Sequence, residues 1–292
     1  MSIYVKNASG DRRKVAGAGL PGPAGKSAYQ YAVEGGFSGT EDEFRALMGV
    51  RSNSNLLHNA YWASKDYITN QLGQEEYTED GYTIDRWISI GLTVTLEDGW
   101  LKLQNTSADE YGYFLQLGEI GEYDSLVGSQ YAISALYKCN TQGCDVHSGC
   151  TTTETDDYHV VHPSVLLDAD GQPHAASSAA NIQDQDAAIN RWEHMIISAA
   201  PGATVWLKAA KLERGPVQTL AHQDEEGNWV LNDPPPDKAL EQLKCQRYYR
   251  VFATQNLRPT KAEDYCPPMR VNPALGTIVI NGVTYYTADA NL

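Results

Sequence analysis

Apolar and polar residues alternate with a period of two through the middle of the chain, between Asn55 and about Leu220. This alternation is typical of strands that place one face on a hydrophobic core. Polar or glycine-containing gaps separate most of the apolar runs, as in a sandwich. The pattern predicts eight strands, at residues 83–90, 92–96, 100–104, 113–117, 131–137, 159–167, 194–198 and 205–212. This number of strands suits a jelly-roll β-sandwich, so we expect a mostly β fold.

Four tryptophans lie inside or beside these strands, namely Trp87, Trp100, Trp192 and Trp206. Large rings in strands usually pack in the interior. We therefore expect all four to belong to the core of the sandwich.

Helical signals precede the sandwich. Ser27 can cap a first turn that the glycines at 35–36 stop. Thr40 and Glu43 then form a capping box, with apolar residues on one face of positions 44–48. A helix of about nine residues is marginal alone. Its apolar face therefore needs a partner, either other protomers or the next domain.

The pattern of apolar and polar residues changes again after Leu220. A proline-rich spacer at 233–236 leads to Asp237, a candidate N-cap for a helix over 238–252 with Leu240 and Leu243 among its apolar positions. This helix is either a short trimeric coil or an amphipathic helix packed on the sandwich. Asn281-Gly282 between two β-rich runs predicts a terminal hairpin. The domains predicted are 1–54, an attachment arm with short helices; 55–220, the sandwich; and 221–292, spacer, helix and hairpin.

A short Gly-X-Y run places glycine at positions 19, 22 and 25. Three polyproline-like chains need glycine at every third position, because no larger residue fits at their common axis. Gly19, Gly22 and Gly25 are therefore candidate trimer-interface residues, together with Leu240 and Leu243. The alternative is a proline- and glycine-rich linker.

Residues 26–49, which follow this run and begin Lys-Ser-Ala-Tyr, resemble the connector of tail-fibre and baseplate proteins from phages and prophages of Gram-positive gut bacteria. Asn-Leu-Leu-His-Asn at 55–59 and Gly-Tyr-Thr-Ile-Asp-Arg-Trp at 81–87 resemble the opening of the carbohydrate-binding-module-like jelly roll of such fibres. Residues 207–219 resemble its last strand, and 243–250 the linker that follows. The order of these motifs also matches the family. Only about forty residues follow, so a complete receptor-binding head at the C-terminus is in doubt.

The resemblance implies a homotrimeric virion protein of the phage tail, made in the bacterial host cytoplasm. Its implied partners are copies of itself, other tail or baseplate proteins, and a host cell-surface glycan. The N-terminal end usually attaches to the virion in this family.

The composition limits the classes of ligand. With 37 acidic and 22 basic residues the net charge is -15, which repels nucleic acid and anionic lipid over distance. The aromatic residues are 18 Tyr and 6 Trp against 4 Phe, a balance that suits strands and sugar-facing surfaces. No apolar run has the length of a membrane span, and the N-terminus lacks a signal-peptide pattern. We expect no nucleic-acid partner and no membrane insertion.

The five cysteines are an odd number, so they cannot all pair within one chain. Cys139, Cys144 and Cys150 lie close together with His147 between them, but their spacing is too irregular for a zinc knuckle. A surface loop with a disulfide or free thiols is the better interpretation. Residues 168–171 begin like a calcium loop but lack its later ligands, which favours a turn. We expect no metal and no cofactor.

Enzyme motifs are absent from the sequence, and its GxGxxG match at 17–22 contains prolines where a phosphate-binding helix would begin. We predict a protein that is not an enzyme. The alternatives are a glycan-cleaving tail enzyme and a stand-alone glycan-binding module. If the sandwich binds sugar, rings that we expect to be exposed in loops are the candidate contacts: Tyr61, Trp62, Tyr111 and Tyr158.

Overall fold

The computed structural model describes residues 3–6, 12–16, 28–36, 38–40, 53–118, 128–152, 158–181, 189–280 and 282–290. The chain divides into two compact units, Met1–Arg51 and Ser52–Leu292. In the first unit, β1 (Ile3–Lys6) pairs antiparallel with β2 (Arg12–Ala16), and α1 spans Ala28–Glu34. Gly36 follows α1 with a φ of 99°, which confirms the predicted glycine stop. Gly19, Gly22, Gly25 and the predicted second helix lie outside the described residues.

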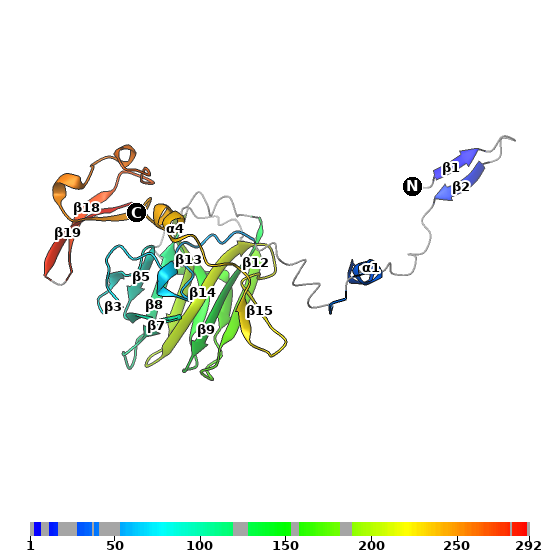
Figure 1. Ribbon diagram of the computed structural model, residues 1–292, viewed down its shortest axis with the longest axis horizontal. Helices are drawn as coiled ribbons and strands as arrows, with labels where there is room; N and C mark the ends of the chain where they lie inside the picture. The colour runs from blue at the N-terminus through cyan, green and yellow to red at the C-terminus, as the bar shows by residue number, and fades with distance from the viewer. Residues whose placement is uncertain are drawn as a thin grey trace. The chain divides into compact units, whose positions relative to one another are not determined.

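Two six-stranded antiparallel sheets form the body of the second unit (Figure 1). The first, called the β9 sheet, has the order β12-β9-β14-β7-β6-β3. Its strands are β12 (His174–Asn181), β9 (Gln130–Cys139), β14 (Thr204–Arg214), β7 (Trp100–Gln104), β6 (Thr93–Glu97) and β3 (Glu76–Tyr77).

The second, called the β10 sheet, has the order β11-β10-β13-β8-β5-β4. Its strands are β11 (Tyr158–Leu166), β10 (Asp145–Thr152), β13 (Ile189–Ala199), β8 (Gly112–Leu117), β5 (Trp87–Ile90) and β4 (Gly81–Tyr82). Successive strands along the chain often lie in different sheets, as in a jelly roll. The predicted mostly β sandwich is confirmed.

The predicted strands all correspond to observed ones, but the sequence pattern missed four strands of the sandwich: the two-residue strands β3 and β4, and the longer β10 and β12. Residues 145–152, expected to be a surface loop, form β10 inside a sheet, and β12 was not expected. The sequences of these strands, Asp-Val-His-Ser-Gly-Cys-Thr-Thr and His-Ala-Ala-Ser-Ser-Ala-Ala-Asn, contain small and polar residues. Such residues give no clear period of two, because both faces look alike in polarity.

Aromatic rings fill the space between the sheets. Trp62, Trp87, Phe114 and Trp192 are all fully buried. The Trp87 and Phe114 rings stack with centroids 4.7 Å apart, and Trp62 meets Trp87 edge-on at 5.2 Å. Core packing of Trp87 and Trp192 is therefore confirmed.

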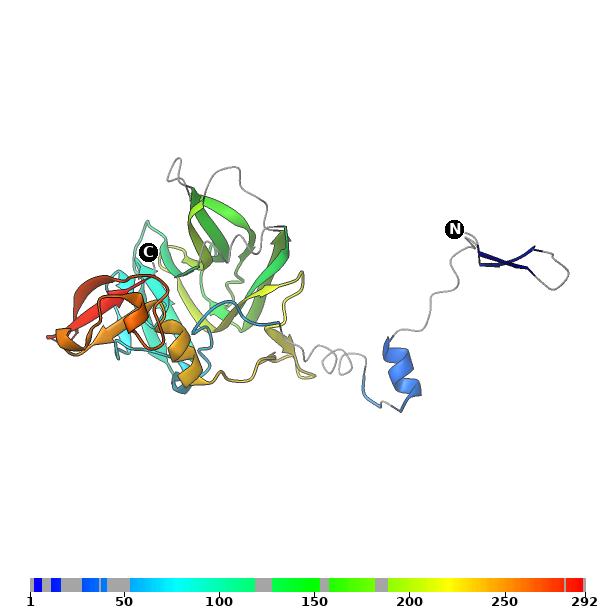
Figure 2. The same ribbon diagram turned by 90° about the horizontal axis from the view of Figure 1, so that it is seen from above.

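The C-terminal part of the second unit packs on the sandwich. A hairpin of β15 (Ala221–Gln223) and β16 (Trp229–Leu231) lies against the β9 sheet, with Leu220 and Ala221 touching Leu136 and Ala209. A three-stranded sheet with the order β17-β19-β18 follows at the C-terminal end of the unit (Figure 2). It consists of β17 (Tyr249–Phe252), β18 (Ala274–Ile280) and β19 (Val283–Asp289). The predicted terminal hairpin is confirmed, with Ile280 opposite Val283.

The helix α4 (Lys238–Cys245) begins at the predicted cap, where the Asp237 carboxylate accepts hydrogen bonds from two backbone amides. It is shorter than predicted, because 249–252 forms β17 instead. Its buried residues are Glu241 and Cys245, and the Glu241 carboxylate accepts the Asn59 N–H at 3.0 Å. The helix therefore packs on the sandwich by its less apolar side.

As a result, Leu240 and Leu243 of α4 are 54% and 47% exposed. Neither described helix has the length and apolar character needed to cross a membrane.

Candidate ligand-binding face

The outer surface of the β9 sheet carries two tryptophans that sequence analysis assigned to the core. Leu101 and Leu103 of β7 and Val205 and Leu207 of β14 are fully buried between the sheets. Because side chains alternate along a strand, Trp100 and Trp206 must point to the opposite side. Both rings are only partly buried. The prediction of core packing is thus wrong for Trp100 and Trp206.

Three lysines surround these rings. Lys138 of β9 and Lys102 of β7 lie directly opposite Trp206 on its two neighbouring strands. The Lys138 and Lys208 ammonium groups lie 4.1 and 5.4 Å from the centroid of the Trp100 ring. These are cation–π distances. We call Trp100, Trp206, Lys102, Lys138 and Lys208 the aromatic–lysine face.

A β-bulge at Lys208 shapes this face. Leu207 lies opposite Tyr137 on β9, and Ala209 lies opposite the next residue back, Leu136, so Lys208 is the extra residue. A bulge breaks the regular alternation of side chains. Lys208 is on the same side of the sheet as Trp206, two residues earlier, and the bulge puts the next residue, Ala209, on that outer side as well.

Tyr61 borders the aromatic–lysine face. It forms an isolated antiparallel bridge with Ala209, whose side chain touches the β15–β16 hairpin on the outer surface. Directly opposed residues share one side of a sheet. The Tyr61 ring meets the Tyr67 ring edge-on at 5.6 Å, and burial, with lesser effects of Tyr67 and Asp233, raises the pKa of Tyr61. Tyr61 is therefore held in place beside the open part of the surface.

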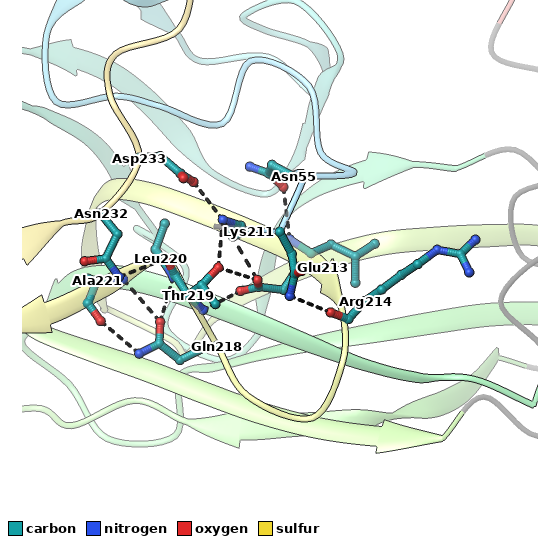
Figure 3. Close-up of polar contacts among 12 residues, drawn as sticks. Asn55, Lys211, Glu213, Arg214, Gln218, Thr219, Leu220, Ala221, Asn232 and Asp233 are labelled. Carbon is teal, nitrogen blue, oxygen red and sulfur yellow. Dashed lines mark hydrogen bonds and ion pairs between the residues drawn. The ribbon is translucent and has the colours of Figure 1, made fainter. Parts of the chain in front are cut away.

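A buried polar network fastens the hairpin segment over the other part of the outer surface (Figure 3). Lys211 and Glu213 of β14 have no exposed side-chain surface. The Lys211 ammonium contacts Asp233 at 2.8 Å and the Thr219 hydroxyl at 3.0 Å. Glu213 accepts the Thr219 N–H at 2.6 Å and its hydroxyl at 2.5 Å. The segment that carries β15 and β16 is thus tied to the sheet at both ends.

A polar pocket of about 540 Å³ lies at one end of the β9 sheet. It is lined by Asn140, Gln142, Asp168, Ala169, Asp170 and His174. The Asn140 side-chain oxygen accepts the Thr204 N–H at 2.8 Å. His174 lies opposite the buried Tyr137, so the pocket is at the end of the strands and is not part of the aromatic–lysine face.

Inside this pocket the Asp170 carboxylate accepts the Gln172 N–H at 2.8 Å and faces the His174 ring at 2.9 Å. The Gln172 bond, with a smaller contribution from His174, lowers the pKa of Asp170. The first bond closes an Asx-turn, and Gly171 has a φ of 73°. The interpretation of 168–171 as a turn is therefore confirmed. Across the described parts of the chain, no three His, Cys, Asp or Glu side chains gather as metal ligands.

The predicted glycan contacts have different outcomes. Trp62 was expected to be an exposed loop ring, and this is wrong: it is fully buried against Trp87 and Phe114. Its polar sequence neighbours concealed this, because the segment 55–62 continues the β9 sheet along β14, with the Trp62 N–H bonded to the Lys208 carbonyl at 2.8 Å. Tyr111 is 45% exposed, as expected. Tyr158 opens β11 instead of lying in a loop, and its side chain is outside the described structure.

The cysteine cluster also differs from expectation. Cys139 and Cys144 are free thiols, but both are fully buried at the ends of β9 and β10. Their mutual hydrogen bond lowers the pKa of Cys139 and raises that of Cys144. The side chain of Cys150 lies outside the described structure.

The sequence did contain a signal for the face that was missed. In Trp-Leu-Lys-Leu-Gln at 100–104, the two leucines occupy one side of the strand, and Trp100 then shares the other side with Lys102. A tryptophan in phase with a lysine indicates an outward ring.

No protein-family model and no curated protein sequence matches the chain. Among solved structures, it is similar to the CBM22-1 xylan-binding domain of Xyn10C from Paenibacillus barcinonensis, at 11% identity over 57% of this chain and 97% of that one, with a TM-score of 0.34. The C-terminal family 22 carbohydrate-binding module of Clostridium thermocellum Xyn10B gives 12% identity, 50% and 97% coverage and a TM-score of 0.36.

The enzymatically active domain of tailspike protein 4 from bacteriophage CBA120 gives 11% identity, 56% and 22% coverage and a TM-score of 0.34. This chain thus spans about a fifth of that tailspike domain's length. At TM-scores this low, the similarities carry no argument about the ligand.

Proposed function

We propose that the protein binds glycans, without cleaving them, through the aromatic–lysine face. The observation that carries the proposal is the pair of partly exposed indole rings, Trp100 and Trp206, on the uncovered surface of a β-sheet. Sugar rings bind proteins by apolar contact of their C–H faces with aromatic rings and by hydrogen bonds from their hydroxyls. The ammonium groups of Lys102, Lys138 and Lys208 supply hydrogen-bond donors next to the rings.

The first test is binding of the intact protein to an oligosaccharide array, compared with the variant Trp206→Ala. We expect at least a tenfold loss of affinity, because truncating an anchoring tryptophan typically costs more than about 1 kcal/mol. Tyr113→Ala is the matched control, since Tyr113 is 37% exposed on the β10 sheet. Unchanged binding by Trp206→Ala, with the fold retained, would refute the assignment of the face.

The assembly in which the face would act is a homotrimeric phage tail-fibre or baseplate protein, located in the virion and made in the host cytoplasm. The Gly-X-Y run and the motifs described above support this assignment. Weak glycan contacts become useful in such an assembly, because three linked copies raise the effective concentration. Other tail or baseplate proteins would be its remaining partners. The rivals are a stand-alone glycan-binding module and a glycan-cleaving tail enzyme, and release of shortened sugars from a bound polymer would favour the enzyme.

We expect light scattering coupled to size exclusion to give a mass near three times 32.1 kDa. The exposed Leu240 and Leu243 of α4 are candidate contacts between protomers. The double variant Leu240→Ser/Leu243→Ser should then lower the mass, whereas Leu257→Ser, at a residue 66% exposed elsewhere in the unit, should not. A monomeric native protein would remove the trimer and favour the stand-alone module.

A further inference from the structure

The lysines of the aromatic–lysine face have a charge that a neutral sugar does not require. Within the described structure, Lys102 pairs with Glu97 at 3.6 Å, whereas neither Lys138 nor Lys208 forms an ion pair with a carboxylate. Their ammonium groups lie over Trp100 instead. The positive charges of Lys138 and Lys208 thus lie at the Trp100 ring, and that of Lys102 lies on the same surface of the sheet.

This local charge is opposite in sign to that of the whole protein, whose net charge is -15. At physiological ionic strength the screening length is about 8 Å, so a ligand on the sheet responds mainly to the nearest charges. The lysines therefore determine what charge the face prefers, although the remote carboxylates repel anions.

We propose that the ligand of this face is an acidic glycan, whose carboxylate or phosphate groups bind Lys138 and Lys208 while its sugar rings contact Trp206. This inference rests on the proposed function and specifies its ligand class. Lys138 and Lys102 flank Trp206 on the two neighbouring strands. The Lys138 and Lys208 ammonium groups both lie at Trp100, so an anionic group on the β7 side of a sugar stacked on Trp206 meets them. Lysine binds such groups as a compact point charge with three donors.

The cation–π contacts position these lysines for that role. Lys138 extends from β9 toward a ring on β7, with β14 between the two strands. Holding a flexible side chain in place before binding reduces the entropy that the ligand contact must overcome. An anion can approach the ammonium groups from solvent, because Lys138 and Lys208 are both partly exposed.

The test uses an array of uronic-acid oligosaccharides together with the same oligosaccharides after carboxyl reduction, which keeps the sugar rings and removes the charge. Teichoic-acid-type phosphate glycans and their dephosphorylated forms provide a second matched set. We expect the native chain to bind members of an acidic set at least tenfold more tightly than their neutral counterparts. This preference should weaken as salt is raised from 50 to 500 mM.

The variant Lys138→Gln/Lys208→Gln should lose about tenfold in affinity for the acidic ligand and leave binding of the neutral counterpart within about twofold. Lys261→Gln is the matched control, because Lys261 is exposed in the C-terminal part of the unit. Equal binding of charged and neutral sugars, or an undiminished acidic preference in the double variant, would overturn the inference while the proposed function stands. Absence of binding to either member of every pair would overturn both.

Discussion

Replacing Lys211 by methionine is expected to lower the free energy of unfolding by about 3–5 kcal/mol, because breaking a buried ion pair leaves the other charge buried without compensation. Lys211 and Glu213 are both fully buried beneath the hairpin segment. The substitution retains the aliphatic stem but removes the cation between Glu213 and Asp233. Urea unfolding followed by circular dichroism measures the change, provided that the transition is two-state.

The double variant Lys211→Met/Glu213→Leu separates the cost of an unpaired charge from the cost of lost packing. We expect it to be less destabilised than the sum of the two single variants, because neither charge remains. Lys261→Met is the control for removal of an exposed lysine. If Lys211→Met changes the free energy of unfolding by less than about 1 kcal/mol, the network does not hold the segment.

The second large effect is expected at Trp62, where alanine should cost about 3–5 kcal/mol of stability. The ring is fully buried, and its contacts with Trp87 and Phe114 would be replaced by a cavity between the sheets. The same urea experiment measures this loss. Trp206→Ala is the matched comparison, since a partly exposed ring leaves no closed cavity and should cost much less.

Because Trp62 was a candidate glycan contact, its alanine variant must be interpreted through stability. Loss of glycan binding by Trp62→Ala would reflect unfolding and would not place the ring in a binding site. A variant that retains wild-type stability would contradict the position of Trp62 in the core.

Much of the fold could be predicted from the sequence, because its strongest signals are local. Val205 and Leu207 alternate with polar or outward residues, the Asp237 carboxylate caps a helix, and Asn281-Gly282 marks a turn. Each of these patterns depends on neighbours within a few residues. The sequence pattern did not predict the strands β10 and β12, because their pairing depends on partners far away in the sequence.

The candidate site was harder to predict, since exposure is a property of the assembled sheets. Trp62 and Trp206 are both tryptophans near polar residues, yet one is buried and the other faces outward. The Trp62 ring packs between the sheets against Trp87 and Phe114, whereas Trp206 lies between two lysines on the outer side of its sheet. Such neighbours cannot be identified without the strand register.

The hairpin over the β9 sheet limits the path of any long polymer that lies on it. Leu220, Ala221 and Trp229 occupy the surface above Leu136 and Ala209, so the uncovered area is bounded on one side. A polysaccharide on this face cannot follow β9 and β14 past Leu136 and Ala209 as an uninterrupted rod. A linear backbone is therefore expected to cross the strands, along the row Lys138–Trp206–Lys102.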